Sequence, residues 1–112
     1  MTTPHQSKLL TRAEEYVLLA VLKLEEEAYS LPIKQFVERI TGKNWTLGGI
    51  YIPLYRLEDK GFLKSNLGDP TRERGGKRKR FYSITTKGKT ALKSQRRIER
   101  AILAELEKEH LD

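Results

Sequence analysis

The segment from 46 to 61, TLGGIYIPLYRLEDKG, constrains the fold more than any other part of the sequence. Its aliphatic residues recur at spacings of three and four, which predicts an α-helix with one apolar face. Thr46 is a typical N-cap residue before such a helix, and Gly61 is a typical residue just after its last turn. The inner face is expected to consist of Leu47, Ile50, Leu54 and Leu57.

The opposite face of this predicted helix is unusual for a solvent-exposed surface. It carries Gly48, Gly49, Tyr51, Tyr55 and Arg56 where Glu and Lys are common. Glycines near a helix N-terminus let a partner approach the backbone N–H groups, where the helix dipole also favours anions. We therefore interpret the segment as a recognition helix that contacts a nucleic-acid groove and phosphates, with Thr46 at its start. An ordinary amphipathic helix is the alternative interpretation, and the segment alone does not decide between them.

A helix at the start of the chain is predicted by a capping box. Thr11 and Glu14 have the Thr-x-x-Glu spacing, and the helix that follows is expected to continue to the glutamates at 25–27. It is apolar around most of its circumference, which exceeds what one core-facing side needs. We therefore expect a central helix that also contacts a second subunit through Tyr16 and Leu19.

A second helix is expected from Ser30 to the residue before Gly42. Its short turn leads directly into the recognition helix, and two helices joined in this way are typical of a helix-turn-helix. In the turn, Lys43 and Asn44 are expected to support DNA binding, and Trp45 is expected to pack between the helices. The inner face of the second helix is expected to consist of Ile33, Phe36, Val37 and Ile40.

The pattern changes from helical to extended after Gly61. Segments 62–67 and 80–85 each show partial alternation, which predicts a pair of antiparallel strands. The loop between them is long, basic and rich in turn residues. A strand pair after a helix-turn-helix is a wing, whose basic loop can bind phosphates or enter the minor groove; a solvated loop without this role is the alternative. The residues expected to contact DNA here are Arg74, Lys77, Arg78 and Lys79.

A last helix is expected from about 87 to 110, with Thr86 as its N-cap. Such a helix would be about 36 Å long, which is more than the preceding domain needs. Its apolar stripe is therefore expected to contact a second copy of the chain. We divide the chain into a DNA-binding domain, 9–86, and a dimerisation helix, 87–112. The candidate dimer contacts on the helix are Ile98, Ile102 and Leu106.

The composition favours an acidic partner, because the formal net charge of the 112 residues is +7. No segment approaches the roughly 18 apolar residues of a membrane span, and the N-terminus lacks the apolar region of a secretory signal. Cysteine is absent, which excludes disulfides and thiolate chemistry. No spacing indicates a catalytic or metal site. We expect a cytoplasmic protein that is not an enzyme and uses no cofactor or metal.

Three segments resemble the PadR-like family of transcriptional regulators, and the likeness covers nearly the whole chain. They are LTRAEEYVLLAVL, GGIYIPLYRLEDKGFL and GGKRKRFYSITTKGKTAL. The resemblance implies a mainly α fold with a small β-hairpin, in which a winged helix-turn-helix is followed by a C-terminal dimerisation helix, as in the short subgroup. It also implies a homodimer that binds a palindromic operator, usually as a repressor. In the third segment the family pattern is matched by Arg78, Arg80, Tyr82, Thr85 and Gly88.

Two departures from the family pattern affect the function. The family often has proline directly after the tyrosine, whereas Ile52 follows Tyr51 here and Pro53 comes next; the missing amide leaves the tilt of the helix open. Members of the short subgroup can bind aromatic or drug-like molecules in the dimer cleft, some between tryptophans of the last helix. That helix has no tryptophan here, so whether a small-molecule effector binds stays open.

Two other functions remain as alternatives. A winged helix can serve as a protein–protein interaction module within a transcription or replication assembly, and it would then bind duplex DNA weakly and with little dependence on salt. The same basic surface could bind RNA, with a preference for single strands or structured RNA. The sequence lacks the cluster of exposed aromatic residues on a sheet that RNA-binding domains commonly use.

Overall fold

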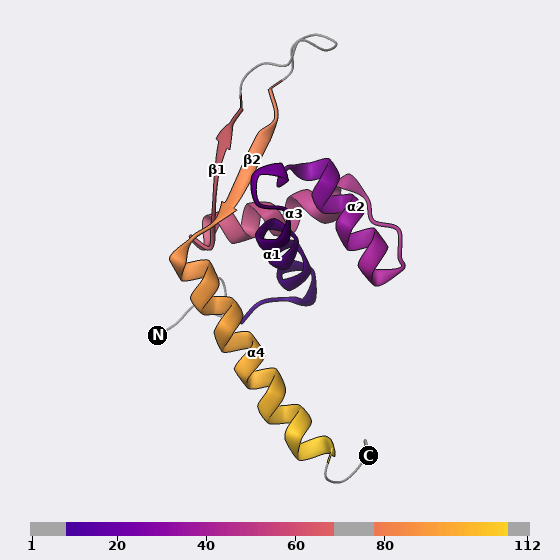
Figure 1. The fold of residues 1–112 in the computed structure, drawn as a ribbon, viewed down its shortest axis with the longest axis vertical. Coiled ribbons are helices and arrows are strands. Elements are labelled where there is room, and N and C mark those ends of the chain that lie inside the picture. The colour runs from indigo at the N-terminus through magenta and orange to yellow at the C-terminus, as the bar shows by residue number, and fades with distance from the viewer. Residues whose placement is uncertain (1–8, 69–77, 108–112) are drawn as a thin grey trace.

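The computed structural model describes residues 9–68 and 78–107. Within these ranges the chain forms four α-helices, one short 3₁₀ helix and one antiparallel hairpin, so the predicted class of a mainly α chain with a small β-hairpin is confirmed (Figure 1). In chain order the elements are α1 (Arg12–Leu24), η2 (Glu25–Glu27), α2 (Ser30–Thr41), α3 (Leu47–Asp59), β1 (Leu63–Leu67), β2 (Arg80–Ile84) and α4 (Thr86–Glu107).

The capping box at the start of α1 is confirmed. The Oγ1 of Thr11 accepts a hydrogen bond from the backbone N–H of Glu14 at 3.1 Å, and the Glu14 carboxylate accepts one from the Thr11 N–H at 2.8 Å. The α-helix ends at Leu24, earlier than expected, because Glu25 adopts a φ of 52°. Residues 25–27 form the 3₁₀ turn instead.

The carboxylate of Glu14 is buried, which the sequence pattern did not indicate. Its Oε2 lies 3.0 Å from the Nζ of Lys60, just after α3. A buried charge is tolerated only when it is paired, so this contact explains how a glutamate occupies the core side of α1. The ion pair fastens the start of α1 to the end of α3.

Both predicted ends of α3 are confirmed. The Oγ1 of Thr46 accepts a hydrogen bond from the Gly49 N–H at 2.9 Å, which caps the first turn. Gly61 adopts a φ of 81°, and its N–H bonds to the carbonyl of Glu58 at 3.0 Å while the next N–H, of Phe62, bonds to the carbonyl of Leu57 at 2.8 Å. This pair of bonds is the Schellman motif that ends many helices.

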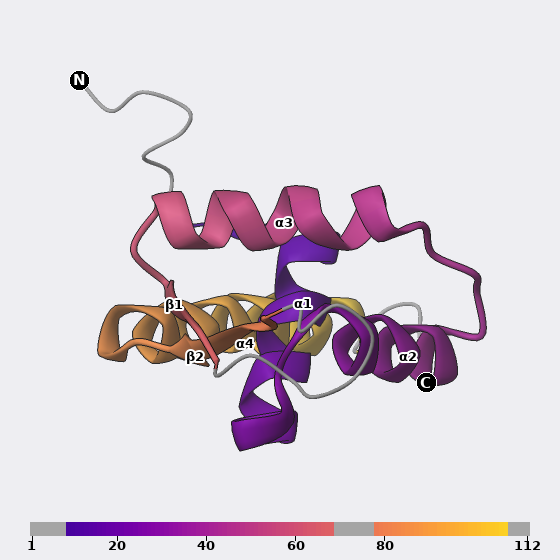
Figure 2. The ribbon, with the colours of Figure 1, turned by 90° about the horizontal axis from the view of Figure 1, so that it is seen from above.

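The core forms where α1, α2 and α3 meet. Two residues predicted to face it are exposed: Ile40 retains 61% of its accessible surface and Leu47 retains 51%. They flank the turn between α2 and α3, which lies at one edge of the molecule, so the core does not extend to them (Figure 2). Pro53 is buried and completes the inner face of α3. The other predicted inner-face residues that are buried are Ile33, Val37, Ile50, Leu54 and Leu57.

The wing is attached to the helices at its base. β1 and β2 pair antiparallel, with Leu63 opposite Ile84 and Leu67 opposite Arg80. The N–H of Tyr82 donates a hydrogen bond to the carbonyl of Ala28 at 2.8 Å, ahead of α2. The strands then extend away from the helices, as Figure 1 shows. The orientation of the wing is therefore fixed relative to the helix-turn-helix.

The cap of α4 is Thr85 and not Thr86. The Oγ1 of Thr85 accepts a hydrogen bond from the Gly88 N–H at 3.0 Å and donates one to the carbonyl of Gly61 at 2.7 Å. The prediction of Thr86 was wrong by one residue. The two threonines are adjacent in the sequence, and only the hydrogen bond from Thr85 to the distant Gly61 distinguishes them. Gly88 packs so closely on the carbonyl of Phe62 that a Cβ would overlap it.

The helix α4 packs against the core at its N-terminal end and then extends away from it. Ala91 and Leu92 are buried, whereas most side chains beyond them are exposed. The amide of Gln95 donates to the carbonyl of Leu10 at 3.1 Å and accepts from its N–H at 3.3 Å. This pair explains why a glutamine interrupts the apolar stripe. Among the helices of the described ranges, none is long and apolar enough to cross a membrane.

Candidate nucleic-acid interface

The helix α3 forms one outer layer of the molecule. Figure 2 shows no other described helix or strand on its outer side. Ile52 and Tyr55 project there, with 55% and 73% of their surfaces accessible, and Tyr51 is 48% accessible. The side of α3 opposite the core therefore forms a free surface in the described part of the chain, as a recognition helix requires.

The two glycines at the start of this surface differ in their surroundings. A Cβ on Gly48 would have no neighbour nearer than the Thr46 Oγ1, at 3.9 Å. On Gly49 it would lie 3.2 Å from that same oxygen and 3.7 Å from the ring of Trp45. The absence of a side chain at Gly49 thus serves the helix cap, whereas Gly48 opens the helix surface to an outside partner.

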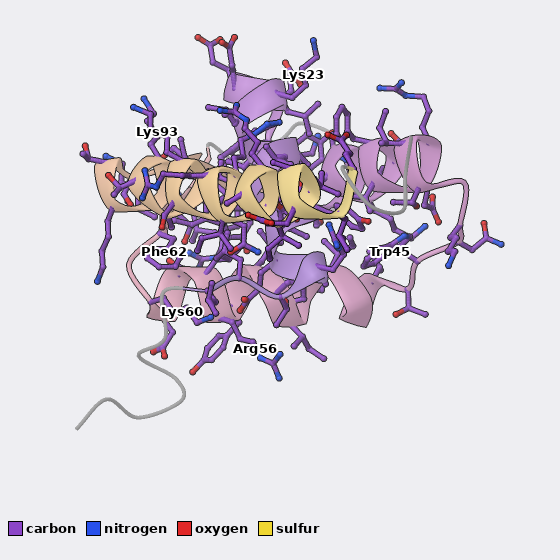
Figure 3. The ribbon with its side chains drawn as sticks, turned by 90° about the horizontal axis from the view of Figure 1, so that it is seen from below. Lys23, Trp45, Arg56, Lys60, Phe62 and Lys93 are labelled. Carbon is purple, nitrogen blue, oxygen red and sulfur yellow. The ribbon has the colours of Figure 1, made fainter. Side chains whose placement is uncertain are left out.

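Tyr51 and Arg56 are both exposed on α3. The Tyr51 hydroxyl donates a hydrogen bond to the Oγ of Ser30, at the first turn of α2, at 3.2 Å. Arg56 projects from the outer side of α3 in Figure 3. No ion pair joins it to another described residue, the nearby Glu58 and Asp59 included.

The turn that presents α3 is held by Glu38, which the sequence did not single out. Its carboxylate accepts a hydrogen bond from the Trp45 N–H at 3.0 Å and one from the Nζ of Lys34 at 3.1 Å. The backbone bond from Trp45, followed by the bond from Lys34, lowers the pKa of Glu38 below its ordinary 4.5. The charged carboxylate stabilises the turn in which the exposed Lys43 and Asn44 lie.

Trp45 has the packing role that was expected. Its indole N–H donates a hydrogen bond to the Thr41 Oγ1 at 3.2 Å. The ring also packs edge-on against Tyr16, with 6.3 Å between the ring centroids. These contacts join the turn to α1 and leave Trp45 partly buried.

The basic residues at the base of the wing are exposed but each contacts the protein. The Nε of Arg78 donates to the carbonyl of Gly68 at 2.8 Å, and the Nζ of Lys79 lies 4.5 Å from the centroid of the Tyr29 ring. Arg80 donates to the Oγ of Ser65 at 3.1 Å, consistent with a role in the strand pair. The other predicted wing contacts, Arg74 and Lys77, lie outside the described residues.

A hollow of about 520 Å³ lies between the wing and the helix-turn-helix. Three basic side chains line it, together with the start of α2, whose N-cap residue Tyr29 provides no side-chain hydrogen bond. Both features favour an anion. A nucleic-acid backbone that lay along α3 would therefore meet positive charge at the wing as well. The lining residues are Tyr29, Ser30, Tyr51, Leu67, Arg78, Lys79, Arg80 and Tyr82.

The candidate dimer residues fall into two groups. Tyr16 and Leu19 of α1 are partly buried against the core of the same chain. Ile98, Ile102 and Leu106 are exposed on the part of α4 that has left the core. A row of exposed aliphatic residues on one helix is the kind of surface that a partner covers.

A known family shares the sequence pattern that produces this geometry. The pattern of the transcriptional regulator PadR-like family matches residues 18–94, more than half of the chain. The chain belongs to the PadR-like family of transcriptional regulators. Regulators of this family bind DNA, and α3 with its wing is the part of the fold suited to that task. No protein with a curated description matches the sequence.

Solved structures share the fold of this PadR-like protein. A transcriptional regulator from Clostridium thermocellum is 21% identical, with a TM-score of 0.69 over 88% of this chain and 89% of its own. A PadR-like transcription factor from Bacteroides fragilis is 22% identical, with a TM-score of 0.66 over 84% and 86%. A PadR family regulator from Clostridium difficile R20291 is 23% identical, with a TM-score of 0.59 over 84% and 95%. At these identities the likeness shows the fold alone.

Proposed function

We propose that this PadR-like protein is a sequence-specific regulator that binds a palindromic operator in double-stranded DNA as a homodimer and represses transcription. The observation that carries the proposal is the free outer face of α3 beside a basic wing (Figure 2). A helix of this width fits the major groove, and basic residues on either side of it can bind the phosphates. A dimer of this kind that is bound to a promoter would prevent RNA polymerase from binding there. We propose that the protein acts in the cytoplasm.

The proposed contacts divide between the major groove and the backbone. The helix-turn-helix would provide the groove contacts and the phosphates next to them, and the wing would bind the backbone or the minor groove. Thr46 would act at the start of α3, where its side chain already caps the helix. The residues proposed to contact DNA are Lys43, Asn44, Thr46, Gly48, Gly49, Tyr51, Arg56, Arg74, Lys77, Arg78 and Lys79.

The proposed dimer uses α4 as its main contact. The exposed stripe of Ile98, Ile102 and Leu106 would pack against a second copy, with Tyr16 and Leu19 at its edge. Two-fold symmetry of such a dimer would match the symmetry of a palindromic operator. The chain would then divide functionally into residues 9–86, which bind DNA, and residues 87–112, which join the protomers. We propose no small-molecule effector.

A titration of labelled duplexes tests this function. The duplex from the DNA upstream of the protein's own gene is compared with a shuffled duplex by fluorescence anisotropy at several salt concentrations, and sedimentation gives the number of protomers bound. We expect tight binding of the native duplex, a steep salt dependence and two protomers per site. Ile102→Lys should abolish the dimer and weaken operator binding, whereas Ile40→Lys, at an exposed isoleucine of α2, should do neither.

One observation favours a second function. The free face of α3 exposes Tyr51, Ile52 and Tyr55, and Leu47 is exposed at the start of the helix; a protein partner could also cover this apolar surface. A protein–protein interaction module predicts weak binding to both duplexes and little dependence on salt. The same titration therefore distinguishes the two functions.

A further inference from the structure

The free face of α3 lacks most of the side chains that read bases through hydrogen bonds. The helix reads LGGIYIPLYRLED and contains no Asn, Gln, Lys, Ser or Thr. Asn and Gln recognise adenine in the major groove, and Arg or Lys recognises guanine. Arg56 is the one basic residue of this helix, and the Tyr51 hydroxyl already bonds to Ser30. Base recognition by α3 must therefore depend largely on apolar contact.

Ile52 occupies the centre of the surface that would face the bases. Gly48, Ile52 and Arg56 are spaced four residues apart and so lie in one row along the helix. Gly48 has no side chain, so DNA can approach the first turn closely, and Ile52 is the next side chain in the row. Glu58 and Asp59 are exposed at the other end of α3, where their charge opposes close approach of phosphates. The N-terminal half of α3 is thus the part suited to enter a groove.

The charge around this apolar surface favours DNA over an apolar protein partner. Arg56 borders it on the helix, Lys43 is exposed in the preceding turn, and Arg78 and Lys79 lie at the base of the wing. A partner that binds this surface must therefore carry negative charge at its edges and an apolar group at its centre. Duplex DNA does so, because its major groove carries the C5-methyl group of thymine between two phosphate chains.

We infer that Ile52 reads the C5-methyl group of a thymine, so that the operator half-site has a required thymine where α3 enters the major groove. The inference rests on the proposed function and adds to it the base that is recognised and the residue that recognises it. Removal of one methyl group from such an apolar contact corresponds to about a three- to fivefold decrease in affinity. Arg56, one turn further along the row, would then lie toward the phosphates or a guanine.

The test uses duplexes that differ by single methyl groups. A random duplex pool is first selected on the wild-type protein to obtain its preferred half-site. Duplexes of that sequence are then made with deoxyuridine replacing each thymidine in turn, which removes the methyl group and keeps the base pair. Their affinities are measured for the wild type, for Ile52→Ala, and for Ile40→Ala as a control that truncates an isoleucine of similar exposure on α2.

The expected result is a specific pattern. Deoxyuridine at one position of the half-site should weaken wild-type and Ile40→Ala binding by about three- to fivefold. Ile52→Ala should bind the thymidine and deoxyuridine duplexes equally at that position. If the wild type binds a selected half-site tightly but loses no affinity with any deoxyuridine, the inference is overturned and the proposed function stands. If no sequence is enriched from the pool, the proposed function fails and the inference fails with it.

Discussion

The hydroxyl of Tyr51 lies 3.2 Å from the Oγ of Ser30, and this hydrogen bond joins the middle of α3 to the first turn of α2. Both helices of the helix-turn-helix are thus tied at a second point, far from the turn that connects them. Half of the tyrosine surface is still accessible. The residue therefore fixes the direction of α3 and also forms one flank of its free face.

Removal of this hydrogen bond should lower the stability only slightly, and the effects of removing its donor and its acceptor should not add. Tyr51→Phe and Ser30→Ala should each lower the free energy of unfolding by up to about 1 kcal/mol, because a solvent-accessible hydrogen bond contributes modestly. The double variant should be no less stable than the less stable of the two single variants, because both substitutions remove the same hydrogen bond. A double-mutant cycle in urea measures this. Simple addition of the two effects would mean that the bond does not contribute in solution.

Alanine at Gly48 should affect folding and DNA binding in opposite directions. A Cβ there meets nothing nearer than 3.9 Å, so Gly48→Ala should gain up to about 1 kcal/mol of stability from helix propensity. It should at the same time weaken operator binding, because the added methyl separates α3 from the DNA. Thermal unfolding and anisotropy measure the two effects.

Gly49→Ala provides the comparison for Gly48. Its Cβ would crowd the Thr46 Oγ1 at 3.2 Å, so it should be less stable than Gly48→Ala. Unchanged operator affinity in Gly48→Ala would show that DNA does not approach the first turn of α3.

Charge removal on the wing should reduce the salt dependence of DNA binding. Neutralising Lys77 and Lys79 together should weaken binding to all duplexes and flatten the salt slope by about two units, because each lysine is expected to neutralise one phosphate. The matched control is Lys23→Ala with Lys93→Ala, two lysines that lie away from the outer side of α3 in Figure 3. An equal decrease of slope in both double variants would assign the effect to net charge instead of to the wing.

The turn before α3 should lose stability in acid. The Trp45 N–H and Lys34 bonds hold the pKa of Glu38 below its ordinary 4.5. A carboxylate with a lowered pKa stabilises the fold fully above its unfolded pKa, and this contribution is lost as the pH falls through the folded pKa. Glu38→Gln should therefore be less stable than the wild type at neutral pH, and the difference should narrow as the pH falls below 4.5.

Urea unfolding across this pH range measures the contribution of Glu38. The charge-matched control is Glu26→Gln, which removes an exposed carboxylate from η2. If the difference between Glu38→Gln and the wild type were the same at every pH, the carboxylate charge would not hold the turn.

Local signals were enough to predict most elements of this fold. Thr11, Thr46, Gly42 and Gly61 mark helix ends through bonds or angles that depend on near neighbours, and each was placed correctly. Periodicity was less reliable at the ends of helices, since it continues through Ile40 where the core has already stopped. A pattern along one helix contains no information on how far its neighbours extend.

Two contacts that the sequence did not indicate join residues far apart in the chain. Glu14 binds Lys60 at a separation of 46 residues, and Gln95 binds the backbone of Leu10 at a separation of 85. The free face of α3 was predicted from residue type alone. The different surroundings of Gly48 and Gly49 required the positions of atoms, because both glycines fit the same pattern.

The two sides of α3 share no residues, and this separation has an evolutionary consequence. Buried positions such as Ile50 and Leu54 constrain the fold, whereas Gly48 has open space around its Cα and Ile52 has 55% of its surface accessible. Substitution on the free face therefore costs little folding energy. A lineage with this architecture can acquire a new target through a few replacements on one side of a single helix, while the scaffold that presents the helix stays intact.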